Sequence, residues 1–165
     1  MTDHSPVLYI LCGKIASGKS TLASELAANT RGVVVAEDVW LHALFSDELN
    51  SPDDYFRYAR RLRKTLKSHV VDLLNAGVSV ILDFQANTVQ SRQWMKSIIK
   101  DANVDHELHL LNASDRQCLD RLASRNAKGD HPFQVSEAEY WQVTRHFTVP
   151  SEDEGFKITV HDEND

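Results

Sequence analysis

The residues from Gly13 to Ser20, GKIASGKS, match the phosphate-binding pattern G-x-x-x-x-G-K-[ST] at every fixed position. Glycine at both ends lets the backbone curl without side-chain clashes, and the curled backbone points successive N–H groups at phosphate oxygens. Lys19 would place a positive charge against the β- and γ-phosphates of a nucleotide, and the Ser20 hydroxyl would bind Mg²⁺. The motif therefore predicts a site for Mg²⁺ and ATP.

The segments on either side of this loop fit the same prediction. The preceding run, Val7–Cys12, is continuously apolar, as in a strand that is buried on both faces of a parallel sheet. The following run, Thr21–Ala28, is rich in helix-forming residues. The loop would then join a buried strand to the N-terminus of a helix, where anions bind. A chance glycine-rich turn is the alternative.

Asp83 is a candidate to complete the metal site. It ends another apolar run, Val78–Leu82. A carboxylate at the end of a buried strand, in a chain with a complete phosphate loop, is expected to hold Mg²⁺ through water. The alternative role for Asp83 is to cap the helix that follows it.

Two further acids, Glu37 and Asp38, follow the β-branched run Val33–Ala36, which is typical of a short strand. From the end of that strand, Asp38 could deprotonate or orient a substrate hydroxyl. Capping of the helix around Trp40 is the competing role, and Glu37 competes with Asp38 for the catalytic one. Successive strand residues point to opposite faces, so we expect only one of the two acids to reach the substrate.

Arg121 and Arg125 lie one helical turn apart, directly before a polar segment that contains Gly129 and Pro132. Arginines on a mobile flap can hold phosphates as charge develops in a transition state. The sequence therefore predicts a lid at about residues 126–135, with Arg125 and then Arg121 as its catalytic arginines. A solvated helix face is the alternative for both.

Other basic residues have less defined roles. Arg92 follows Asp83 in the chain and could face the same edge of the sheet. One strongly basic run falls on a single predicted helix and consists of Arg57, Arg60, Arg61, Arg63, Lys64 and Lys67. These residues surround most of the helix outside its apolar stripe, so a solvated face is the expected role. Binding of an anionic substrate is the alternative.

Strand and helix patterns alternate along the chain. Apolar and β-branched runs predict strands at residues 7–12, 33–36, 78–83, 106–111 and 156–160. Helical periodicity and capping residues predict helices at residues 21–29, 40–45, 52–75, 90–101, 115–125 and 137–147. The alternation predicts an α/β fold with a parallel sheet, helices on both faces, and ligands beyond the carboxyl ends of the strands. That edge would bring the phosphate loop, Glu37, Asp38 and Asp83 together.

The composition is that of a single globular domain spanning residues 1–165. A formal net charge of −6 provides no overall attraction to nucleic acid or to anionic membranes. No apolar stretch is long enough to span a membrane, and Met1–Pro6 lacks the basic segment of a signal peptide. Cys12 and Cys118 form no metal-binding pattern, so we expect both to be buried, and we expect the histidines to be structural or exposed. These features predict a cytoplasmic protein.

The sequence resembles the small P-loop kinases of the zeta-toxin and polynucleotide-kinase-like group, often called AAA-type ATPases. The similarity rests on GKIASGKS, VVVAED, VSVILD with the downstream Arg92, LDRLASRN followed by KGDHPFQVSEAEY, and FTVPSEDEGFKITV. It implies a nucleotide-kinase-like, three-layer P-loop NTPase fold with a short lid. It also implies an ATP and Mg²⁺ site formed by Gly13, Ala16, Ser17, Gly18, Lys19, Ser20 and Thr21. Asp38 would contact the acceptor hydroxyl, and Arg125 and Arg121 would be lid arginines.

These observations favour an ATP-dependent kinase that transfers the γ-phosphate to a hydroxyl of a small molecule. A nucleic-acid 5′-end kinase would need a continuous basic groove toward the phosphate loop, which the acidic net charge disfavours. A nucleotide-binding regulatory module without an acceptor would make no catalytic use of Asp38. The sequence contains no recognisable signature for adenylate, shikimate or gluconate, and it leaves the acceptor and the oligomeric state open.

Overall fold

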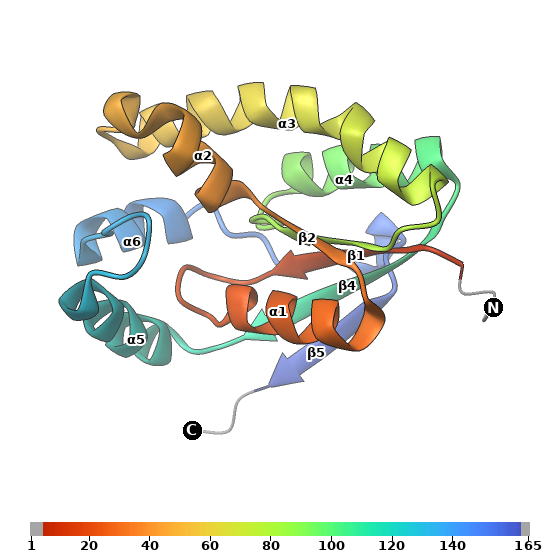
Figure 1. Cartoon of the computed structure of the whole chain (residues 1–165). Helices are drawn as coiled ribbons and strands as arrows, with labels where there is room; N and C mark the ends of the chain where they lie inside the picture. Colours follow the sequence, from red (N-terminus) through yellow and green to blue (C-terminus); the bar gives the residue numbers. More distant parts are fainter. Residues whose placement is uncertain (1–4, 163–165) are drawn as a thin grey trace.

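The computed structural model describes residues 5–162, in which five parallel strands form one sheet between layers of helices (Figure 1). The strands are β1 (Val7–Cys12), β2 (Val33–Ala36), β3 (Val80–Asp83), β4 (Asp105–Asn112) and β5 (Ile158–Asp162). Their order is β2-β3-β1-β4-β5, and every neighbouring pair is parallel. The predicted parallel α/β fold is confirmed. Because β1 and β3 are neighbours, the segments that follow them emerge side by side.

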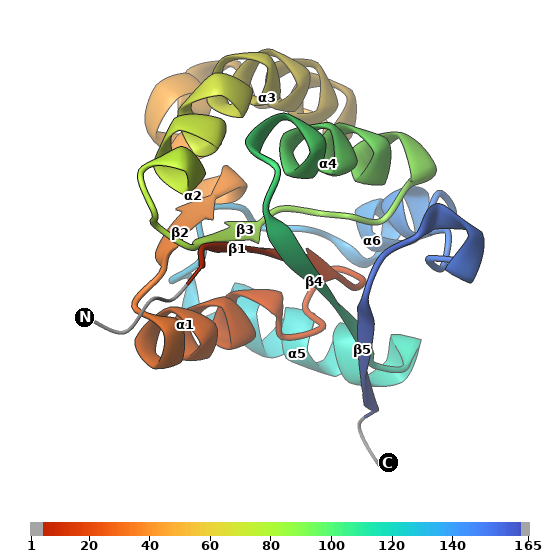
Figure 2. The ribbon, with the colours of Figure 1, turned by 90° about the vertical axis from the view of Figure 1, so that its right-hand side faces the viewer.

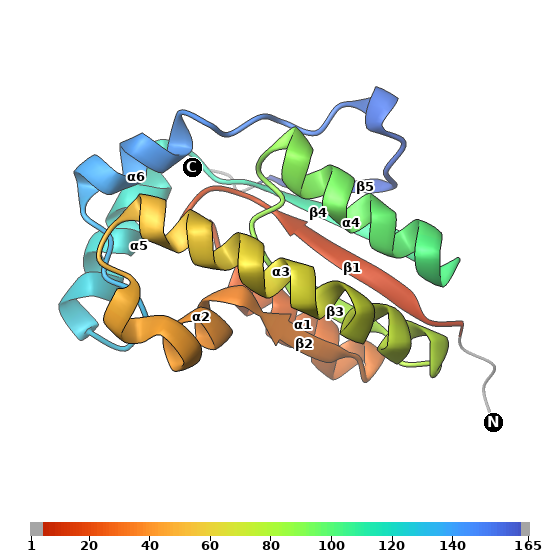
Figure 3. The same ribbon diagram turned by 90° about the horizontal axis from the view of Figure 1, so that it is seen from above.

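The helices are α1 (Lys19–Thr30), α2 (Glu37–Phe45), α3 (Pro52–Asn75), α4 (Val89–Ala102), α5 (Asp115–Lys128) and α6 (Glu137–Thr144). Short 3₁₀ turns at Ser46–Glu48 and Glu152–Glu154 complete the elements of the described chain. α3 and α4 cover one face of the sheet, and α1 and α5 lie on the other (Figure 2). Seen from above, α3 and α4 run next to each other across the sheet (Figure 3).

A large apolar core lies between the sheet and the layer formed by α3 and α4. Leu62, Leu66 and Val70 are buried and recur at helical spacing, so α3 presents one apolar stripe to the sheet. Leu8 and Ile10 of β1 belong to the same buried cluster. Burial of each such side chain contributes about 1.5–3 kcal/mol. This packing fixes α3 on the sheet and leaves its basic residues outside the core.

Glu37 and Asp38 are the first residues of α2 and do not continue β2, which ends at Ala36. Two acids in the first turn stabilise this helix because its N-terminal end carries a partial positive charge. The expectation that strand alternation would point their side chains to opposite faces is therefore wrong. Their surroundings, described below, distinguish the two acids instead.

Several other boundaries differ from the sequence-based expectation, and two of these differences concern the predicted lid and the last strand. α5 continues to Lys128 and ends at Gly129. Gly129 has a φ angle of 68°, which a glycine can adopt without strain. Residues 126–128 of the predicted lid are therefore helical. β5 extends to Asp162, beyond the end of the strand that was predicted at residues 156–160. The N-terminal residues 1–4 and the tail residues 163–165 lie outside the described residues.

Both cysteines, Cys12 and Cys118, are buried, as expected. His109 is also buried, and its Nδ1 atom lies 2.8 Å from Nε2 of His161 on the neighbouring strand β5. This pair links β4 to the edge strand of the sheet. Between residues 5 and 162, no helix has the length and apolar character that crossing a membrane requires.

Candidate active site

The loop between β1 and α1 depends on small residues for its shape. Ala16 and Gly18 have positive φ angles of 61° and 100°, which turn the backbone tightly before α1 begins. A Cβ atom on Gly13 would lie 2.4 Å from Ser17 Oγ, so a larger residue at position 13 would displace that side chain. The glycines of the motif are thus required by the geometry of the loop.

The side chain of Lys19 lies inside the curl of this loop. Its Nζ atom donates hydrogen bonds to the carbonyl oxygens of Gly13 and Lys14, both at 2.8 Å. Burial lowers the pKa of Lys19, and the negative charges of Asp83 and Asp38 oppose that shift. The ammonium group therefore faces two carboxylates from other parts of the chain.

Asn87 holds the start of the loop, although nothing in the sequence pointed to it. Its Oδ1 atom accepts a hydrogen bond from the Gly13 N–H at 2.9 Å, and its Nδ2 atom donates to the Gly13 carbonyl at 2.7 Å. The backbone oxygen of Asn87 accepts in turn from the Thr148 N–H at 2.8 Å. The loop is therefore braced by the segment after β3 and, through it, by the segment that leads to β5.

A second set of contacts ties the loop to α5 and α6. Lys14 Nζ lies 2.8 Å from Asp115 Oδ1, and the Tyr140 hydroxyl donates to the same oxygen at 2.7 Å. The hydrogen bond from Lys14 and, to a smaller extent, the one from Tyr140 hold the pKa of Asp115 below its ordinary value. Arg121 Nη1 donates to the carbonyl of Ser17 at 3.3 Å. Arg121 thus lies against the phosphate loop.

Ser20, at the beginning of α1, and Asp83, at the end of β3, line the same cavity. Burial raises the pKa of Asp83, and the nearby Ser20 hydroxyl opposes that shift. Among residues 5–162, no group of three or more His, Cys, Asp or Glu side chains could hold a metal ion. Mg²⁺ is usually held by one or two protein oxygens together with substrate phosphates and water. A hydroxyl and a carboxylate beside a phosphate loop fit that ion.

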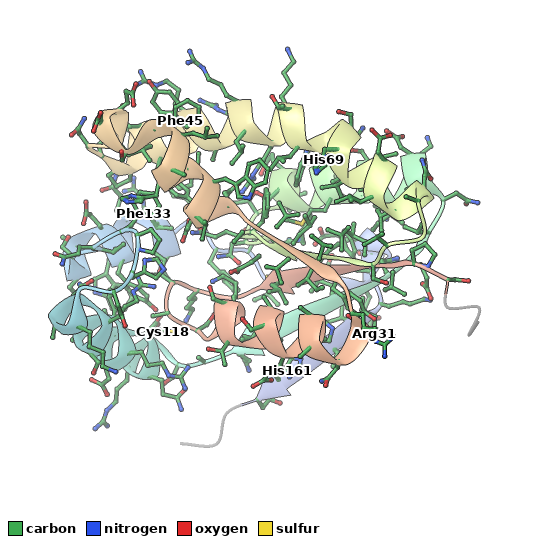
Figure 4. All side chains as sticks on the ribbon, in the orientation of Figure 1. Arg31, Phe45, His69, Cys118, Phe133 and His161 are labelled. Carbon is green, nitrogen blue, oxygen red and sulfur yellow. The ribbon has the colours of Figure 1, made fainter. Side chains whose placement is uncertain are left out.

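Asp38 faces the same space from the first turn of α2. Its Oδ1 atom accepts a hydrogen bond from the Tyr55 hydroxyl at 2.7 Å, and its Oδ2 atom lies 3.9 Å from His131 Nε2. The Asp38 side chain is 36% exposed. Phe133 packs edge-on against Tyr55 and lies between α2 and α6 (Figure 4). His131 therefore lies close to Asp38 in the same space.

Glu37 has a different environment from its neighbour. Its side chain is 1% exposed and accepts hydrogen bonds from Arg63 Nε at 2.6 Å and Arg63 Nη2 at 2.9 Å. Burial would lower the pKa of Arg63, but the Glu37 charge and hydrogen bond raise it overall. Arg63 is thus a half-buried partner of Glu37. The sequence had suggested that Arg63 belongs to a solvated face, and this expectation is wrong. Glu37 joins α2 to α3 and leaves Asp38 as the available carboxylate.

Arg125 lines the same space from α5. Its Nε atom is buried and has no hydrogen-bond partner within the described residues. Burial lowers the pKa of Arg125, and the charges of Asp38 and Asp130 oppose that shift. The guanidinium group is therefore available for a further hydrogen bond, as expected for an arginine that holds a phosphate.

Arg92 does not reach this site, contrary to the expectation that it could face the edge of the sheet. It is fully buried, and its Nε and Nη2 atoms pair with Glu154 at 2.7 and 2.9 Å. Its Nη1 atom donates to the carbonyls of Ala86 and Thr148 at 2.9 and 2.8 Å. These bonds use the whole guanidinium group to join α4 to the segment before β5.

The remaining predicted residues surround one cavity of about 490 Å³. Its lining includes Ala16, Gly18, Lys19, Ser20, Thr21, Asp38, Asp83, Arg121 and Arg125. Gly13 and Ser17 support the loop from outside this lining. The cavity is also lined by Tyr55 and His131, which the residue patterns did not identify as site residues. The predicted lid includes His131 and so could have indicated it, whereas no sequence feature indicated Tyr55.

Solved structures with the same fold were found by comparison. They include a candidate kinase from Chloroflexus aurantiacus, with 22% identity, 96% of this chain and 86% of that chain covered, and a TM-score of 0.77. The APS kinase CysC of Mycobacterium tuberculosis, in complex with AMPPNP and APS, is 18% identical, with 97% of this chain and 91% of that chain covered and a TM-score of 0.66. A chain of the Pnkp1/Rnl/Hen1 RNA repair complex is 25% identical, with 88% of this chain and 45% of that chain covered and a TM-score of 0.69.

No curated protein matches this chain. The family model described as AAA domain, by contrast, matches residues 8–150 and so includes the phosphate loop, both acids of α2, Asp83 and the lid. The chain belongs to this AAA domain family, and its fold is that of the P-loop kinases.

Proposed function

We propose that the protein transfers the γ-phosphate of ATP to a hydroxyl group of a small molecule. The observation that carries this proposal is the position of Asp38. Its carboxylate lines the same cavity as Lys19 and Ser20, but it comes from a different element and makes no hydrogen bond or ion pair with the phosphate loop within the described residues. A protein that only binds nucleotide has no need of such a group.

The residues of the cavity divide the reaction between them. The loop amides and Lys19 hold the β- and γ-phosphates of ATP. Mg²⁺, when bound at Ser20 and Asp83, supplies positive charge to the phosphate oxygens. Arg125 and Arg121 hold the phosphoryl group as its charge redistributes. These groups position the donor and leave the acceptor side to Asp38.

The transfer itself requires one bond to form and one to break. The acceptor oxygen bonds to the γ-phosphorus, and the bond between that phosphorus and the bridging oxygen of ADP breaks. Asp38 accepts the proton of the acceptor hydroxyl. Asp38 Oδ1 accepts the hydrogen bond from Tyr55, so Oδ2, which lies 3.9 Å from His131 Nε2, is the oxygen that would accept this proton.

The test is a transfer assay with γ-labelled ATP against sugars, aminoglycosides, nucleosides and oligonucleotides. Asp38→Asn keeps the shape of the side chain and removes the base, so transfer should fall by about 10²–10⁴-fold. ATP affinity should stay within about threefold. Asp72→Asn, an exposed change on α3, is the matched control and should transfer normally.

Two outcomes would contradict the proposal. Transfer by Asp38→Asn at the wild-type rate would remove Asp38 from the reaction. Binding of ATP by the wild-type protein, with no transfer to any acceptor in the panel, would favour a nucleotide-binding module.

A further inference from the structure

A second cavity, of about 560 Å³, lies next to the first one. It is formed mainly by α3, by the segment that leads into α4 and by the start of α4. Figure 3 shows that α3 and α4 run next to each other. The two cavities share Tyr55, Phe56, Gln85 and Val143 in their linings. A molecule whose hydroxyl lies near Asp38 can therefore extend past Tyr55 and Phe56 into the second cavity.

The two cavities differ in charge. The first is lined by Glu37, Asp38, Asp83 and Glu139 as well as by cations. The second is lined by Arg60, Arg63, Lys64 and Lys67, with no Asp or Glu among its described lining residues. These four cations recur at helical spacing and so form one stripe of α3 along the cavity. The second cavity is thus basic although the chain as a whole is acidic.

Two of the four cations are already paired. Arg63 pairs with Glu37, and Lys67 Nζ lies 2.8 Å from Asp101 Oδ2. Arg60 and Lys64 make no hydrogen bond or ion pair within residues 5–162. Their charges are therefore free to meet a ligand.

The opposite wall of the cavity adds to this positive potential. It is the N-terminus of α4, where Thr88 caps the helix by accepting from the Ser91 N–H at 3.1 Å. Gln90 and Ser91, in the first turn, line the cavity. A helix N-terminus carries a partial positive charge and favours anions. Trp94 forms a rigid side wall because it stacks on Phe84 with ring centres 5.5 Å apart.

We propose that the second cavity binds a phosphate group carried by the acceptor, so that the substrate is a small alcohol that already bears a phosphate monoester. This inference rests on the proposed kinase function for the identity of the molecule as the acceptor. Arg60 and Lys64 bind the phosphate, and the hydroxyl at the other end of the molecule lies near Asp38. The basic run of α3 thereby has a role in substrate selection.

A binding experiment tests the cavity without any transfer. Inorganic phosphate is titrated into the Lys19→Ala protein, in which the main cation of the phosphate loop is absent, and its affinity is measured by calorimetry. Adding Arg60→Gln and Lys64→Gln should raise the dissociation constant at least tenfold. The control protein carries Arg57→Gln and Arg61→Gln instead. These substitutions remove two positive charges from the same helix at positions outside the cavity, so the dissociation constant for phosphate should change less than twofold. Equal constants in the two proteins would overturn the site.

A kinetic experiment tests the substrate class. Each acceptor is offered as the free alcohol and as its phosphate monoester: glycerol and glycerol 3-phosphate, glucose and glucose 6-phosphate, adenosine and adenosine 5′-monophosphate. We expect at least one monoester to have a kcat/KM at least tenfold above that of its alcohol. Arg60→Gln/Lys64→Gln should raise the KM for that monoester at least tenfold, with kcat and the KM for ATP within threefold. Arg57→Gln/Arg61→Gln should match the wild type.

The outcomes separate the two proposals. If phosphate binding depends on Arg60 and Lys64 but no acceptor is phosphorylated, the anion site stands and the kinase proposal fails. If transfer occurs equally well to an alcohol and its monoester, or best to a 5′-hydroxyl oligonucleotide, the kinase proposal stands and the phosphorylated-alcohol inference is overturned.

Discussion

The Tyr55 hydroxyl lies 2.7 Å from Asp38 Oδ1 and joins the first turn of α3 to the first turn of α2. Burial and the charges of Glu37 and Asp38 raise the pKa of Tyr55 well above its ordinary value, so the phenol remains a donor. The contact orients the Asp38 carboxylate. Tyr55 is therefore a positioning residue for the proposed base.

Removal of this hydrogen bond should affect catalysis more than binding. A hydrogen bond to a charged group contributes about 1.5–3 kcal/mol, so Tyr55→Phe should lower kcat by roughly 10–150-fold. The KM for ATP should stay within about threefold. Tyr58→Phe is the control, because the Tyr58 ring stacks on Phe45 and its hydroxyl makes no hydrogen bond within the described residues. Steady-state kinetics of both variants would decide, and an equal kcat in the two would count against the positioning role.

Two lysines of the phosphate loop should differ in their effect on nucleotide affinity. Lys19 lies inside the curl of the loop, whereas Lys14 points to Asp115 on α5. Lys19→Ala should weaken binding of Mg·AMPPNP by roughly 10–150-fold, the value of a charge-assisted hydrogen bond. Lys14→Ala should change it by less than about threefold. Calorimetry that finds the same affinity for Lys19→Ala and the wild type would remove Lys19 from the donor site.

The segment from Gly129 to Val135 should behave as a lid. It carries His131 and Phe133, which line the cavity, and its end is held by Asn126 Nδ2, which donates to the Val135 carbonyl at 2.7 Å. Closure over a ligand would exclude water and slow amide hydrogen exchange. A bisubstrate analogue should therefore protect this segment, while exchange in the buried strand β3 serves as the reference. Unchanged exchange in the segment, with clear protection of the Gly13–Ser20 loop, would show that no lid closes there.

The pair formed by Arg92 and Glu154 predicts a pH-dependent stability. The hydrogen bond from Arg92 lowers the pKa of Glu154 below its ordinary value of 4.5. An acid whose pKa is lower in the folded state than in the unfolded state stabilises the folded protein at pH values above the unfolded-state pKa. This contribution is lost as the pH falls through the folded-state pKa. The difference in unfolding free energy between wild type and Glu154→Gln should therefore be greatest above pH 4.5 and shrink below it. Denaturant titrations at several pH values measure this difference, with Glu152→Gln, an exposed neighbouring substitution, as the comparison.

The same pair predicts a larger effect when the cation is removed. Arg92→Met leaves Glu154 and the Ala86 and Thr148 carbonyls without their donor. Breaking a buried pair by removal of one partner costs about 3–5 kcal/mol. Denaturant unfolding at pH 7 measures this loss. A loss below 1 kcal/mol would mean that the guanidinium contacts are replaced by others.

The sequence was sufficient for features whose causes are local. The phosphate loop was predicted because its glycines, Lys19 and its flanking strand and helix are adjacent in the chain. Asp83 was placed at the carboxyl edge of the sheet because it directly ends an apolar strand in the chain. Asp38 was assigned to the correct edge of the sheet but to the wrong element, because an acid that follows a short strand can equally begin a helix.

Contacts between distant residues were beyond sequence patterns. Arg92 lies 62 residues from Glu154, and Asn87 lies 74 residues from Gly13. Each pairing depends on how α4 and the segment before β5 pack on the sheet, which no local spacing encodes. The basic stripe of α3 is similar: its helical spacing is visible in the sequence, but the cavity beside it exists only because α4 packs alongside.

The double hydrogen bond between Asn87 and Gly13 makes the phosphate loop a preorganised receptor. Fixing the backbone of one residue costs about 1–2 kcal/mol in conformational entropy, and here this cost is met during folding instead of during ligand capture. The shape of the receptor is consequently coupled to Thr148, whose N–H holds the Asn87 carbonyl. A substitution near Thr148 can therefore loosen nucleotide capture without altering any residue of the loop.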